Sequence, residues 1–263
     1  MSAAGISLPG VVAVNTFREA VRDRVLYNLI FFALVMMGAA ILVGKISFGI
    51  ERLVIINLGL SAISLFGLVM AIFIGVGLVS KEIEKRTLYT LLAKPIRRWE
   101  FLVGKYAGLL LTLAMNTLLM TFGLAAALFY VSRHFLRADV SILVAVYFIL
   151  LELALVTALA LFFSCFSSPM LATLFTLGIY IAGVFAKDIR DFGEVTNSQA
   201  LGQITRVIYY LLPNFHNFNA IAFAAHGQSI PLSLISMNTL YAMAYCAVVL
   251  LASAAAFSGR NLK

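Results

Sequence analysis

Long apolar runs with almost no charge dominate this chain and restrict the folds open to it. A bilayer core about 30 Å thick is crossed by about 20 helical residues, and six stretches reach or approach that length. Within a bilayer the backbone polar groups must be satisfied inside the protein, so each stretch is expected to be a helix. The sequence predicts an all-α integral membrane protein whose six transmembrane helices cover residues 25–44, 53–80, 102–131, 140–166, 169–186 and 233–257.

Composition argues against a soluble protein. The chain is 63% hydrophobic and only 11% charged, whereas a soluble domain has about 45–50% apolar and about 25% charged residues. The net charge of +8 does not indicate nucleic acid, because the basic residues flank the apolar runs. In that position they orient the chain and attract the anionic headgroups of membrane lipids.

The distribution of Lys and Arg predicts the topology. The N-terminal segment, the second and fourth loops and the C-terminal tail together hold twelve of the nineteen basic residues, and seven of these fall between Lys81 and Lys105. Because Lys- and Arg-rich short loops stay on the cytoplasmic side, both termini are predicted to be cytoplasmic. The protein would then be a multi-pass protein of the cell (inner) membrane.

Residues 8–24 precede the first predicted span. Val11, Val14, Phe17 and Val21 recur at helical spacing, with charged residues on the opposite face. This pattern predicts an interfacial amphipathic helix on the inner membrane surface. A plain extension of the first span is the alternative.

Residues 187–232 form an outer segment that is too long for a simple loop. An amphipathic helix is predicted up to Leu212, because apolar residues from Ile204 onward follow helical spacing until Pro213. The apolar piece from Phe218 to Ala225 is too short to span, so it lies flat or re-enters the membrane. The polar stretch 187–199 is expected to be mobile.

Few residues suggest catalysis or metal binding. No Walker A loop is present, His134 and Asp139 have no further partners for acid–base chemistry, and the three His residues show no ligand spacing. Cys165 and Cys246 are expected to be buried apolar residues. The chain is therefore predicted not to be an enzyme and to hold no metal.

One acidic residue, Glu152, lies well inside a predicted span. An ionised carboxylate is costly there, so Glu152 should face the protein interior, be paired or be protonated. Thr157, Asn57 and Asn116 are the candidate hydrogen-bond partners. These polar residues either belong to a translocation route or form a structural hydrogen-bonded group.

The segment 81–100, between the second and third spans, combines basic charge with an apolar stripe. Ile83, Leu88, Leu91 and Leu92 share one face of a predicted helix, which Pro95 should end. In the third span, Gly104 and Gly108 permit close helix approach, either within the chain or between chains. The alternative for the loop is an ordinary solvated basic segment.

This segment resembles the permease subunits of ABC-2 type exporters. Their pattern is an acidic residue, Thr-Leu, Leu-Leu, Pro-Ile-x-Arg, an aromatic-acid pair and Gly-Lys. The matching positions here are Glu82, Glu84, Thr87, Leu88, Leu91, Leu92, Pro95, Ile96, Arg98, Glu100, Gly104 and Lys105. Residues 15–27, 163–172 and 209–219 also resemble the family, whereas Arg86 stands where many members have Gly.

The resemblance implies a single ABC-2 type transmembrane domain over residues 1–263. It implies a dimer with a second permease copy and docking on separate ATP-binding-cassette ATPase subunits, which would hold ATP and Mg; the permease itself would carry no cofactor. Residues 82–92 would be the coupling helix and residues 11–23 a connecting helix beside the same ATPase. The residues expected to couple the permease to the ATPase are Glu82, Glu84, Arg86, Thr87, Leu88, Leu91, Leu92, Pro95 and Arg98.

A secondary transporter or channel that needs no ATPase is the alternative function. Proton-driven carriers usually place several ionisable groups in their spans, whereas Glu152 stands almost alone. Many carriers also contain inverted repeats, and none is visible between residues 25–131 and 140–257.

Overall fold

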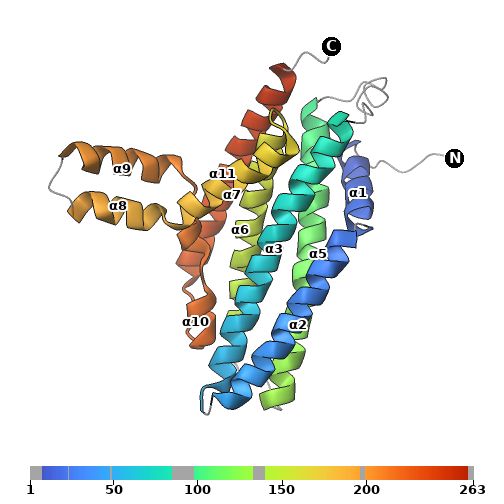
Figure 1. Cartoon of the computed structure of the whole chain (residues 1–263). Helices are drawn as coiled ribbons and strands as arrows, with labels where there is room; N and C mark the ends of the chain where they lie inside the picture. The colour runs from blue at the N-terminus through green and yellow to red at the C-terminus, as the bar shows by residue number, and fades with distance from the viewer. Residues whose placement is uncertain are drawn as a thin grey trace.

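The structure, a computed structural model, describes residues 8–22, 24–47, 49–84, 98–132, 140–195 and 199–259. In these ranges the regular elements are all helices, most of them gathered in one bundle (Figure 1). In chain order they are α1 (Leu8–Val21), α2 (Arg24–Ile46), α3 (Glu51–Glu84), α5 (Arg98–Ser132), α6 (Val140–Ser164), α7 (Pro169–Val184), α8 (Ala186–Val195), α9 (Gln199–Leu211), η2 (Phe215–Phe218), α10 (Ile221–Ala225) and α11 (Leu232–Gly259).

Four helices of the described chain are long and apolar enough to cross a membrane, in α3, α5, α6 and α11. A fifth crossing is formed if α7 and α8 are taken together, although the two helices are bent by 52°. The apolar part of α2 covers Ala33–Ile46, which is shorter than these. The chain is therefore a multi-pass membrane protein, and the count of six spans remains a prediction.

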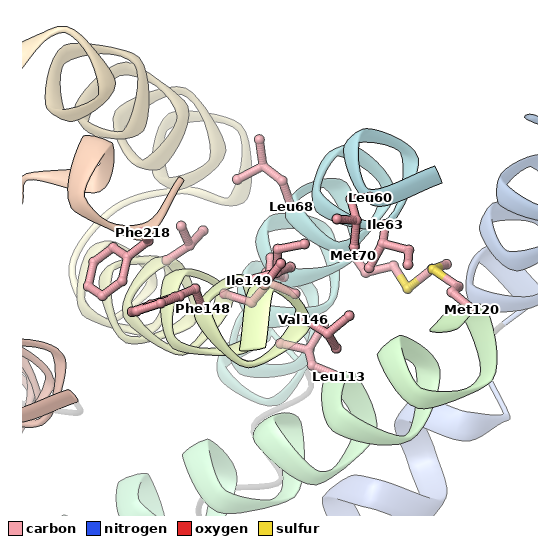
Figure 2. Packing of buried hydrophobic residues seen from close by; sticks show 14 of the residues in the cluster. Leu60, Ile63, Leu68, Met70, Leu113, Met120, Val146, Phe148, Ile149 and Phe218 are labelled. Atoms are coloured by element: carbon pink, nitrogen blue, oxygen red, sulfur yellow. The ribbon is translucent and has the colours of Figure 1, made fainter. Parts of the chain in front are cut away.

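Helix α6 forms the centre of the bundle. It is apolar on all sides, as expected of a helix surrounded by other helices, and most of its 25 residues are buried. Figure 2 shows Val146, Phe148 and Ile149 of α6 in the cluster of buried residues contributed by α3, α5 and η2. Helices α3 and α6 approach each other closely at Gly75, where an added Cβ would lie only 3.0 Å from the Cβ of Ala160. Small residues commonly permit such packing in membranes.

The outer segment begins with a helical hairpin. Helices α8 and α9 pack against each other and project sideways from the bundle (Figure 1). The guanidinium carbon of Arg190 lies 5.2 Å from the centre of the Tyr209 ring, and Gly193 leaves room for Thr205. The polar stretch 187–199, which is expected to be mobile, is helical as far as Val195 in α8. Polar residues form a helix here because α9 supplies a packing partner.

Helix α9 ends before Pro213, as its missing N–H predicts, and the chain is then attached to α11. The backbone N–H of Asn214 donates to the Tyr241 hydroxyl at 2.9 Å, and the Tyr245 hydroxyl donates to the Leu211 carbonyl at 3.0 Å. The following apolar piece contains the five-residue helix α10, which is too short to cross a bilayer.

Candidate functional site

Helix α1 is seated on the first turns of α5, where two glycines remove the side chains that would separate the helices. A Cβ on Gly104 would lie 2.8 Å from the Pro9 carbonyl oxygen, and a Cβ on Gly108 would lie 2.5 Å from the Ala13 carbonyl oxygen. The backbones of the two helices are therefore in close contact. The Gly104–Gly108 pair serves packing within the chain.

A buried cation reinforces this contact. Lys105 is only 3% exposed, and its Nζ lies 3.8 Å from Oε2 of Glu19 on α1. The same Nζ is 5.8 Å from the centre of the Phe101 ring, within the range of a cation–π interaction. A buried lysine is stable only when its charge is paired, so the ion pair and the glycine contact hold α1 and α5 together.

The buried face of α1 differs from the predicted apolar stripe. Val11 and Val14, which belong to that stripe, are 44% and 43% exposed. The face toward α5 instead carries Val12, Thr16 and Ala20, and the latter two are almost fully buried. Val11 and Val14 of the predicted stripe are therefore left free, while Phe17 and Val21 are partly buried and smaller side chains make the contact with α5.

Several segments that are distant in sequence meet at this end of the bundle. Phe101 and Leu102 of α5 form a small buried cluster with Cys165, from the turn between α6 and α7. Val12 of α1 and Ala254 of α11 pack against the cluster. Helix α1 and the end of α11 thus lie at the end where α3 stops and α5 begins (Figure 1).

The predicted coupling residues lie only partly within the described chain. Glu82 and Glu84 belong to the last turns of α3, and Arg98 is the first residue of α5. The remaining positions, Arg86, Thr87, Leu88, Leu91, Leu92 and Pro95, lie outside the described residues.

Glu152 has a different partner from those that the sequence suggested. The Tyr180 hydroxyl of α7 donates to Glu152 Oε1 at 2.8 Å, and Glu152 is only 8% exposed. Thr157 instead donates to the Leu153 carbonyl, and Asn57 is exposed. Asn116 is buried, but its amide nitrogen has no hydrogen-bond partner.

An open apolar groove of about 460 Å³ lies between α3 and α7. One wall is formed by α3 and the other by the first three turns of α7. Its lining residues are Phe73, Val76, Gly77, Pro169, Met170, Thr173, Leu174 and Leu177. None of the polar residues singled out in the sequence lines it. The groove was not predicted, because it depends on the angle between two helices that are distant in the sequence.

No three His, Cys, Asp or Glu side chains in the described parts of the chain are grouped as metal ligands would be. His134 and Asp139 lie outside those parts. The fold and the sites described above define a helical multi-pass membrane protein with an apolar groove, in which α1, α5, α11 and the turn after α6 pack together at one end.

A family comparison identifies this class further. The model of the ABC-2 family transporter protein matches residues 11–262, nearly the whole chain, so the protein belongs to that family. The match confirms the resemblance that the segment 81–105 carries. The family is a transmembrane component, not itself a catalytic subunit. A search of curated proteins found no match.

Proposed function

We propose that the chain is the permease subunit of an ATP-driven exporter, coupled to separate ATP-binding-cassette subunits that hold ATP and Mg. It would work in the cell (inner) membrane as a dimer with a second permease copy, with six spans and both termini in the cytoplasm. Membership of the ABC-2 family supports the transporter class.

The seating of α1 on α5 is the observation that carries the proposed coupling. The segment 85–97 joins α3 directly to α5, and α1 is fixed within the first three turns of α5 by Gly104, Lys105 and Gly108. A soluble partner that displaced this segment would therefore move α1 and α5 together. Closely packed elements transmit such displacements because they do not deform continuously.

The apolar groove between α3 and α7 supports a lipid-like or otherwise hydrophobic cargo. Its lining is almost wholly apolar, and one of its two walls, α3, is a helix long enough to cross a membrane. A cargo with an acyl chain could enter it without burying a polar group, which would be costly. ATP must bind the two arrangements of the complex with different affinity in order to switch them.

Cross-linking from the α3 end tests this function. We expect a photo-cross-linking residue at position 82 to capture a nucleotide-hydrolysing protein when the tagged chain is expressed in its own host. The same residue at position 228, between α10 and α11 at the other end of the bundle, is the control and should capture no ATPase. A reversed pattern, or a lack of ATPase at both positions, would contradict the proposed coupling.

A secondary transporter or channel remains the second candidate, because Glu152 is a buried carboxyl group in a span. Such a protein would be purified from its host without an ATPase and would carry out gradient-driven flux in vesicles. The exporter requires a stoichiometric ATPase, so the two candidates are distinguished by the same purification.

A further inference from the structure

The hydrogen bond between Tyr180 and Glu152 lies one helical turn beyond the apolar groove. The groove follows α7 from Pro169 to Leu177, and Tyr180 lies three residues after Leu177 on the same helix. Its hydroxyl donates to the Glu152 carboxylate of α6 at 2.8 Å. The polar contact thus borders the groove without lining it.

The two halves of α7 are held on α6 by different interactions. In the first half, the Phe175 ring lies 5.6 Å from that of Phe163, and the fully buried Ala172 packs in a cluster with Ala160 and Val76. These contacts are apolar and allow a helix to slide or rotate by small amounts. In the second half, Ile179 and Val184 also pack against the buried core, and the Tyr180–Glu152 hydrogen bond adds a directional contact with α6.

The outer segment (residues 187–232) also contacts Tyr180. The Tyr180 ring lies 5.0 Å from the Phe215 ring of η2. One turn later, Gly183 lies so close to the Pro213 carbonyl and to Phe215 that no side chain would fit. Tyr180 therefore sits between α6 and the outer segment, where a small shift of its ring would move the second half of α7.

We propose that Tyr180 and Glu152 are positioning residues for the groove. Their hydrogen bond fixes the angle of α7 on α6, and this angle sets the separation of α7 from α3 at the outer end of the groove. A hydrogen bond suits this role because little water competes for it among apolar side chains. The inference rests on the proposed function only in that the groove contacts cargo; Glu152 itself does not.

Spin labels on the free chain in nanodiscs test this role. Cys165 and Cys246 are replaced by Ala, and labels are attached at Leu65→Cys on α3 and Ile181→Cys on α7. Both positions are exposed and neither lines the groove. In Tyr180→Phe, which keeps the ring and loses the hydroxyl, we expect the distance distribution of this pair to shift and widen.

Three comparisons make the outcome decisive. A Leu65–Leu171 pair reports on the first half of α7 and should not change in Tyr180→Phe. Glu152→Gln retains an acceptor oxygen and should match the parent, whereas Glu152→Leu should resemble Tyr180→Phe. Tyr147→Phe is the matched control, because it removes a different tyrosine hydroxyl, which lies on α6 and is hydrogen-bonded to the Thr239 hydroxyl of α11 at 2.8 Å. This variant should change the distances of neither label pair.

The proposal is overturned if Tyr180→Phe leaves the Leu65–Ile181 distances unchanged, or if Tyr147→Phe alters them equally. If Glu152→Leu does not fold, the Leu65–Ile181 distances in Tyr180→Phe are sufficient to test the proposal. The measurement needs neither an ATPase nor cargo, so its failure is distinguishable from failure of the proposed transport. If no ATPase is captured from position 82, the spin-label result still stands.

Discussion

Gly108→Leu is expected to release α1 from α5 and to lower the stability of the protein markedly. A Cβ at this position would lie 2.5 Å from the Ala13 carbonyl oxygen and 2.6 Å from the Thr16 Cβ. The backbone oxygen cannot rotate away as a flexible side chain could, so the two helices must separate. Overpacking a close contact typically costs about 1–3 kcal/mol, and we expect the upper end of that range because a leucine adds three further carbons.

The release of α1 can be measured with a cysteine at position 16. Thr16 is 1% exposed and its hydroxyl has no hydrogen-bond partner, so Thr16→Cys should be tolerated and protected from a maleimide reagent. With Cys165 and Cys246 replaced by Ala, we expect slow labelling of the otherwise unchanged protein and rapid labelling when Gly108→Leu is added. Gly38→Leu is the control, since a Cβ there meets nothing within 4 Å. Continued protection of position 16 in Gly108→Leu would show that α1 does not depend on this contact.

The positions of most long helices could be predicted, because a membrane makes length and polarity strong constraints. The apolar runs at 140–166 and 233–257 correspond to α6 and α11, and the end of α9 follows from the missing N–H of Pro213. These features depend on local sequence alone. Features that depend on contacts between helices were harder to predict.

Helix α1 illustrates this difference. Its apolar stripe is evident from helical spacing, but the face that meets α5 is instead the one with Thr16 and Ala20. Close helix packing in membranes favours small residues rather than the most hydrophobic ones. The glycines of α5 are the sequence signal for such a contact, yet they do not specify which helix fills the space they leave.

Glu152 shows the same limit for the polar residues. Its burial could be predicted from the cost of a carboxylate in hydrocarbon, but its partner Tyr180 lies 28 residues away on the next helix. Nothing in the spacing distinguishes Tyr180 from the nearer Thr157, whose hydroxyl is satisfied by its own helix. The partner follows from the angle between α6 and α7, as does the groove beside it.

A charge reversal at Lys105 is expected to disrupt the α1–α5 contact at least as strongly as Gly108→Leu. Lys105→Glu places a carboxylate in a site that is 3% exposed and faces Glu19. Breaking a buried ion pair typically costs about 3–5 kcal/mol, because the remaining charge is left without compensation. We expect a large fall in the melting temperature of the purified protein and labelling of Thr16→Cys.

Two further variants separate the charge from the packing of this side chain. Lys105→Met keeps a long apolar stem and leaves the half-exposed Glu19 solvated, so it should be nearly neutral, as apolar replacement of buried ionic groups often is. Glu19→Lys combined with Lys105→Glu restores opposite charges and should recover most of the melting temperature lost in Lys105→Glu. If the double variant is no more stable than Lys105→Glu alone, the pairing with Glu19 does not hold α1 in place. Recovery would instead show that the buried Lys105–Glu19 ion pair, together with Gly104 and Gly108, makes α1 and α5 move as one rigid unit. A displacement of the segment 85–97 would then be passed to the bundle through both helices.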